Sequence, residues 1–91
     1  MNKIKVSHIL VEKEFEAQDL LRALSEGKSF EDLAMKYSKC PSAKAGGDLG
    51  EISPSRLDED FADAALALKT GETSQKPVRT RFGYHLIKRI A

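Results

Sequence analysis

The sequence predicts an α+β fold with a largely antiparallel sheet, in the order β-α-α-β-α-β-β. Three observations lead to this prediction: an alternating stretch opens the chain, three later segments have apolar residues at helical spacing, and a hairpin pattern closes the chain. Helices and strands are mixed without regular βαβ alternation, which favours an antiparallel sheet over a parallel one.

The first strand is predicted over residues 3–11, where polar and apolar residues alternate and β-branched residues dominate. Alternation puts every second side chain on one face of the strand, here Ile4, Val6, His8 and Leu10.

Two helices are predicted next, each with apolar residues at i, i+3, i+4 and i+7. These residues are Ala17, Leu20, Leu21 and Leu24 in the first helix, and Phe30, Leu33, Ala34 and Tyr37 in the second. Gly27 supplies a stop after the first helix. Ser29, with Asp32 three residues later, resembles a capping box at the start of the second.

The middle of the chain is predicted to be a loop that leads into a short strand at residues 49–53, because Pro41 ends the second helix and small residues follow it. Ser55 with Asp58 predicts a cap that opens a turn of helix carrying Leu57. A third helix is predicted from the apolar residues Phe61, Ala64, Ala65 and Leu68, and ends at Gly71.

The end of the chain is predicted to be a hairpin, with strands at residues 77–80 and 84–90 and a turn at residues 81–83. Pro77 has no N–H to donate to a ladder, so it should open its strand or lie on an edge.

Composition narrows the class of protein. The 91 residues suit one domain, predicted over residues 1–91. A formal charge of +1 gives no support to a nucleic-acid or membrane partner, and no apolar run approaches the roughly 20 residues of a membrane helix. One cysteine, Cys40, excludes an internal disulfide and suits a reducing compartment. With no signal-peptide pattern behind Met1, we expect a free-standing cytoplasmic monomer.

Three side chains could carry chemistry: His8, Cys40 and His85. Each alone is typical of a half-buried structural residue. If they meet, a thiol nucleophile with a histidine base is one option, although no motif supplies an Asn or Asp to orient the base. A zinc site is another, but C-x-x-C and H-x-x-x-H spacings are lacking, so no metal is expected. The third is a hydrogen-bonded polar cluster in an apolar groove.

The glycine-rich stretch at residues 46–50 does not resemble a phosphate-binding loop. It lacks the G-x-x-x-x-G-K-[ST] pattern and leads into a predicted strand rather than a helix. We therefore expect it to serve positive φ angles or close backbone packing.

Several segments together resemble one family, the parvulin-type peptidyl-prolyl cis/trans isomerases. The similar segments cover essentially the whole chain in the right order: Ser7–Val11, Cys40–Gly50, Leu57–Leu68 followed by Gly71-Glu72, and Phe82–Lys88. The resemblance implies a four-stranded antiparallel sheet surrounded by helices.

The resemblance also implies the site residues. By position, His8, Cys40, Thr80 and His85 would form the hydrogen-bonded catalytic group. An apolar pocket for the substrate proline would be formed by Leu49, Leu57 and Phe61, with Phe82 at its rim. Many relatives carry Met at the position of Leu57, an exchange that conserves volume. Relatives vary between Cys and Asp at the position of Cys40, which argues against an obligatory thiolate.

The activity that the resemblance implies is faster rotation about X–Pro bonds in unfolded or flexible protein segments. An apolar pocket that holds the proline can select the twisted amide without a cofactor, a metal or a covalent intermediate. The alternative is a non-catalytic peptide-binding or chaperone-like module on the same fold. For Phe61, we expect one ring face to be exposed in the open pocket.

The substrate is not expected to need phosphorylation. Phosphate-directed relatives place basic side chains between the first strand and the first helix, whereas residues 11–17 here hold three Glu and one Lys. This stretch predicts the small, single-domain, non-phospho-specific type, with neutral or basic residues favoured before the proline.

Overall fold

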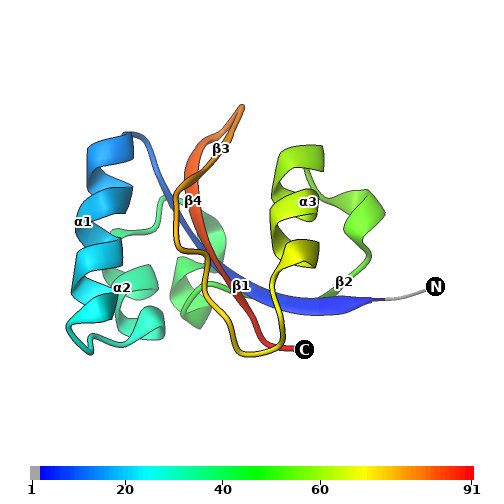
Figure 1. Ribbon diagram of the computed structural model, residues 1–91, viewed down its shortest axis with the longest axis horizontal. Coiled ribbons are helices and arrows are strands. Elements are labelled where there is room, and N and C mark those ends of the chain that lie inside the picture. The colour runs from blue at the N-terminus through cyan, green and yellow to red at the C-terminus, as the bar shows by residue number, and fades with distance from the viewer. Residues whose placement is uncertain (1–2) are drawn as a thin grey trace.

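The computed structural model describes residues 3–91 and has a central sheet with helices on both faces (Figure 1). The strand order is β2-β1-β4-β3, and every neighbouring pair is antiparallel. This confirms the predicted fold class; residues 1 and 2 of the predicted domain lie outside the described residues. The elements are β1 (Ile4–Val11), α1 (Glu14–Ser25), α2 (Phe30–Tyr37), η1 (Pro41–Ala45), β2 (Asp48–Ile52), η2 (Pro54–Arg56), α3 (Glu59–Ala67), β3 (Val78–Thr80) and β4 (Gly83–Arg89), where η marks a short 3-10 helix.

The two faces of the sheet are covered by different helices. In Figure 1, α1 and α2 lie on one side of β1 and β4, and α3 lies on the other. Ile9 and Val11 pack in the cluster that includes residues of α1 and α2, whereas Ile4 and Val6 pack with residues of α3. Alternation along β1 therefore separates two cores, and the even-numbered side chains face α3.

The ends of the first two helices follow the predicted signals. Ser29 Oγ accepts a hydrogen bond from the N–H of Asp32 at 3.2 Å, which caps α2. Gly27 follows α1 with a φ of +95°, the left-handed conformation in which glycine is favoured.

Two predictions in the middle of the chain are wrong. Residues Pro41–Ala45 form η1 where a loop was expected. The predicted cap at Ser55 is not formed, because Pro54 opens the short helix η2 and Asp58 itself caps α3. Leu57 consequently lies between the two helices and not on a helical turn.

The closing hairpin is formed as predicted, with a shorter turn. Pro77 immediately precedes β3, which is an edge strand. Only Arg81 and Phe82 form the turn, and Gly83 already pairs with Thr80. Gly83 has a φ of +137°, and a side chain there would collide with the backbone of β1.

Candidate active site

His8 and His85 come together through the register of β1 and β4. His8 lies opposite Ile87, and His85 lies opposite Leu10. The two histidines are therefore diagonal neighbours on one face of the sheet, close enough for their rings to meet. This is the face that α3 covers, because Ile87 packs with residues of that helix.

A chain of hydrogen bonds crosses three strands at this point. His8 Nδ1 on β1 lies 3.0 Å from His85 Nδ1 on β4. His85 Nε2 lies 2.8 Å from Thr80 Oγ1 on β3, and the N–H of Phe82 donates to the same oxygen at 3.1 Å. Three of the four residues predicted for the polar group are thus joined directly.

Both imidazoles are buried, and burial determines their charge. His8 is 5% exposed and His85 is 4% exposed. Burial, together with a smaller effect of the neighbouring His85, lowers the pKa of His8 to about 4. Burial also lowers the pKa of His85 to about 4, although the carboxylate of Asp58 opposes this shift. The pair is therefore neutral at neutral pH.

Cys40 reaches the site because the segment before it is bound to β1. Ser38 Oγ accepts hydrogen bonds from the N–H of Leu10 at 3.0 Å and from the N–H of Cys40 at 3.4 Å. The N–H of Lys39 donates to the carbonyl of Leu10 at 2.7 Å. Nothing in the sequence pattern had singled out Ser38, because its partner lies far away along the chain.

The thiol of Cys40 is not paired with an imidazole. Within residues 3–91, no hydrogen bond joins Cys40 Sγ to another group, and His8 Nε2 is buried without a partner. A nucleophile and its base need to lie within hydrogen-bond reach. The geometry therefore favours the third of the chemistries left open, a hydrogen-bonded cluster beside an apolar groove.

A pocket of about 400 Å³ lies beside this cluster, which is within the size range of ligand sites. Seven of the eight predicted site residues line it, whereas Thr80 does not. Sequence reasoning missed six further residues of the lining. The complete lining is His8, Leu10, Lys39, Cys40, Pro41, Leu49, Ile52, Arg56, Leu57, Asp58, Phe61, Phe82 and His85.

The two aromatic rings of the pocket differ in exposure. Phe82 is 58% exposed, as expected at a rim. Phe61 is only 4% exposed, so the expected open ring face is wrong. Its ring meets both imidazoles edge-on, with centroid distances of 5.4 Å to His8 and 5.1 Å to His85. Because α3 packs directly on the sheet, the ring covers the histidine pair and also lines the pocket.

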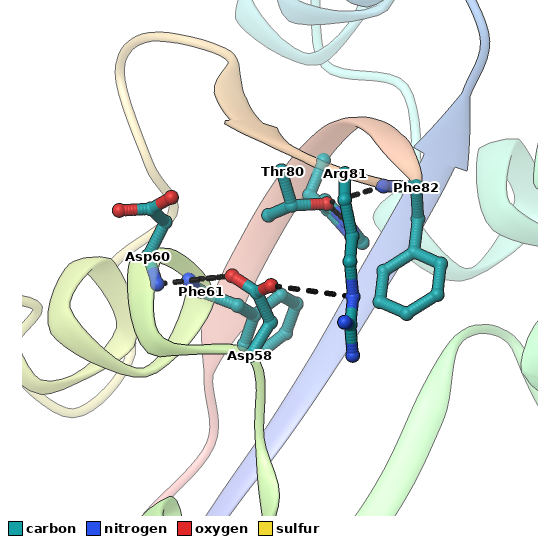
Figure 2. Close-up of polar contacts among 7 residues, drawn as sticks. Asp58, Asp60, Phe61, Thr80, Arg81 and Phe82 are labelled. Atoms are coloured by element: carbon teal, nitrogen blue, oxygen red, sulfur yellow. Dashed lines mark hydrogen bonds and ion pairs between the residues drawn. The ribbon is translucent and has the colours of Figure 1, made fainter.

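Asp58 connects two walls of the site, a role that sequence reasoning missed. Its Oδ1 accepts hydrogen bonds from the N–H groups of Asp60 at 2.9 Å and of Phe61 at 3.3 Å, which caps α3. Its Oδ2 lies 4.0 Å from Nε of Arg81 in the β3–β4 turn, as Figure 2 shows. The capping role has a local signal, an Asp just before a helical spacing. The ion pair with Arg81 has no local signal in the sequence, because Arg81 lies in a distant segment of the chain.

The glycine loop brings η1 and β2 close to the strand that carries His8. Gly46 and Gly47 have φ angles of +69° and +87°. The N–H of His8 donates to the carbonyl of Gly47 at 2.9 Å, and a side chain at Gly47 would collide with the His8 carbonyl. This agrees with the expected need for positive φ and close backbone packing.

Other features of the described residues lie apart from this site. A larger groove of about 710 Å³ runs between α1 and α2, and it contains none of the predicted site residues. Among residues 3–91, no three His, Cys, Asp or Glu side chains are grouped so that they could hold a metal ion. The helices in that range are too short or too polar to cross a membrane.

Comparison with known proteins gives matches over nearly the whole chain. The family described as Rotamase: PPIC-type PPIASE domain matches residues 6–91. The foldase protein PrsA of Bacillus subtilis is 49% identical over 88 residues, covering 96% of this chain and 30% of PrsA. A probable parvulin-type peptidyl-prolyl cis-trans isomerase of Bordetella bronchiseptica is 50% identical over 86 residues, covering 92% of this chain and 33% of that protein.

A solved structure of similar length also matches. The solution structure of NmPin, the parvulin of Nitrosopumilus maritimus, has a TM-score of 0.87 and 43% identity, covering 100% of this chain and 98% of NmPin. By contrast, the chain spans about a third of the length of the two curated relatives.

Proposed function

The chain belongs to the PPIC-type peptidyl-prolyl cis/trans isomerase family, and from that premise we propose how its pocket accelerates rotation about the bond before proline. Amide resonance holds this bond planar, with a barrier of about 18–20 kcal/mol. Uncatalysed isomerisation takes tens to hundreds of seconds, on the order of a slow folding step. In the rotated transition state resonance is lost, so the carbonyl becomes less polar.

In this proposal, the apolar wall of the pocket holds the proline ring. Leu49, Leu57 and Phe61 contact the ring, and Phe82 covers it from the rim. Apolar surroundings disfavour the polar planar amide more than the less polar rotated one, so the pocket binds the transition state preferentially. The support is the mainly apolar lining of a pocket of about 400 Å³.

The polar group keeps the floor of the pocket neutral and rigid. His8, His85 and Thr80 position one another through the hydrogen-bonded chain, and Cys40 contributes a small side chain beside them. Catalysis then needs no covalent bond to the thiol. The observation that carries this proposal is that a neutral, hydrogen-bonded histidine pair lines an apolar pocket.

The substrates that we propose are exposed X–Pro bonds in unfolded or flexible protein segments. We also propose that the 91 residues act as one domain, as a monomer and in the cytoplasm; a single free cysteine supports the last point.

The test is a protease-coupled assay on a short proline peptide, with Leu57→Asp and Leu57→Met as matched variants. Leu57 is only partly buried and lies on no regular element, so both variants should fold. Wild type and Leu57→Met should accelerate isomerisation, whereas Leu57→Asp should abolish it, because it puts a carboxylate in the apolar wall that holds the proline ring. A folded wild-type protein that binds the peptide without accelerating its isomerisation would instead favour the peptide-binding alternative.

A further inference from the structure

The charged side chains that line the proline pocket are Lys39, Arg56 and Asp58. They come from three segments: Lys39 from the link between α2 and η1, Arg56 from the end of η2, and Asp58 from the start of α3. A substrate chain whose proline occupies the pocket must pass these groups on its way in and out. Their charges therefore act on the residues next to the proline.

The negative charge among them is already compensated. Oδ1 of Asp58 accepts two backbone hydrogen bonds, and Oδ2 faces Arg81 (Figure 2). The side chain of Asp58 is 19% exposed, whereas that of Arg81 is 78% exposed and lies over the Phe82 ring, 5.0 Å from its centroid. Asp58 and Arg81 thus cancel each other at the rim.

The two other charges are not compensated. Within residues 3–91, neither Lys39 Nζ nor the guanidinium of Arg56 has an ion-pair partner or a hydrogen bond to a side chain. Both residues are exposed, so their charged ends are free to meet a ligand. Opposite charges raise both the local concentration and the affinity of an anionic group at such a rim.

The glutamates of residues 12–16 do not offset this charge inside the pocket. Glu12 lies with Arg79 and Arg81 in a neighbouring cavity that shares only Phe82 with the proline pocket. Glu16 lines the groove between α1 and α2. Neither lines the proline pocket. The expectation that this stretch favours neutral or basic residues before the proline therefore lacks its physical basis at the site.

We propose that Lys39 and Arg56 select proline segments that carry an acidic side chain directly before or directly after the proline. This inference rests on the proposed function and adds the substrate class to it. Exposed ion pairs are weak, so each cation should change the preference by about two- to fivefold, and salt should reduce the effect.

The experiment measures kcat/KM at low and high salt for matched peptides with Glu, Gln or Lys beside the proline. Wild type should prefer Glu to Lys, with Gln between them, and the preference should shrink at high salt. Arg56→Gln and Lys39→Gln should each reduce it, and Arg56→Glu should abolish it, because the new carboxylate offsets the charge of Lys39. Arg22→Gln is the matched control: it removes the same charge from exposed α1, outside the pocket lining, and should leave the preference unchanged.

The outcomes separate the two levels of the proposal. Equal kcat/KM for Glu, Gln and Lys peptides, or a preference that survives in the Arg56→Glu variant, would overturn the selection of acidic segments while leaving the isomerase activity intact. If none of the peptides is turned over by the folded wild-type protein, the proposed function itself fails, and the selection fails with it.

Discussion

His8 Nδ1 and His85 Nδ1 lie 3.0 Å apart although the two residues are separated by 77 positions in the chain. Two identical ring atoms can form this bond only if one carries a hydrogen and the other does not. The tautomer of one ring therefore determines that of the other. The dependence extends to Thr80, whose hydroxyl donates to His85 Nε2 when His85 Nδ1 is protonated and accepts from it otherwise.

The first prediction concerns the titration of this pair. Both pKa values should be near 4 rather than the ordinary 6.5, because burial disfavours the charged imidazoles. NMR spectra of the ring nitrogens and protons, recorded against pH, measure both values directly. Midpoints near 6.5 for both rings in the folded protein would contradict a buried neutral pair.

The lowered pKa values also predict a loss of stability in acid. The unfolded chain takes up protons at its histidines near pH 6.5, whereas the folded chain does so near pH 4. Stability is therefore complete above pH 6.5 and falls as the pH drops toward 4, by at most about 1.4 kcal/mol per pH unit for each histidine. Urea unfolding between pH 7 and 5, where ordinary carboxyl groups remain ionised, measures this loss.

The second prediction is that Cys40→Asp retains isomerase activity. The thiol has no imidazole partner within the described residues, and the pocket needs no covalent bond in the proposed mechanism. We expect kcat/KM to stay within about tenfold of wild type, whereas loss of a true nucleophile costs about 10,000-fold or more. Cys40→Ser is the control, because it removes the thiol while keeping a side chain of similar size. Complete loss of turnover in a folded Cys40→Asp protein would point to covalent catalysis.

The third prediction concerns Phe61, which both packs in the core and lines the pocket. Because its ring is only 4% exposed, Phe61→Ala should lower the free energy of unfolding by about 3–5 kcal/mol. Activity should fall with it, because the ring also covers both imidazoles. Phe61→Leu keeps more of the volume and should lose less of both. Denaturant unfolding and kcat/KM measure the two effects, and a fully stable Phe61→Ala protein would contradict the buried position.

The fourth prediction is that phosphorylation before the proline is not required. The free cations at the pocket, Lys39 and Arg56, come from separate segments and present no pair of adjacent arginines to bind a phosphate from two sides. Peptides with Ala, Glu, Arg or phosphoserine before the proline should all be turned over, and the extra charge of phosphoserine should make it at most about two- to threefold faster than Glu. A phosphoserine peptide that is turned over about tenfold faster than the Glu peptide would instead indicate a dedicated phosphate site.

The local part of the fold could be predicted because its signals act over a few residues. Alternation in β1, the cap at Ser29, the stop at Gly27 and the proline before β3 each depend on near neighbours in the chain. The same reasoning failed between β2 and α3, where a cap was predicted at Ser55. Pro54 opens η2 instead, and Asp58 caps α3.

The site was less predictable from the residues alone. His8, Cys40 and His85 left three chemistries open, and only the resemblance to a family grouped them with Thr80 and the apolar pocket. Ser38, which binds the Cys40 segment to β1, and Arg56, which lines the pocket, carried no signal of their own.

The regular strands and α-helices follow from spacing, caps and turn residues, which act over a few neighbouring residues. The tertiary structure decided which distant side chains meet. A shift of one residue between β1 and β4 would move His85 to the opposite face, away from His8 and Phe61. The pairing of Asp58 with Arg81, which leaves Lys39 and Arg56 as the uncompensated charges, likewise exists only after α3 has packed on the sheet beside the turn between β3 and β4. Such contacts depend on register and packing across the whole chain, and no local pattern encodes them.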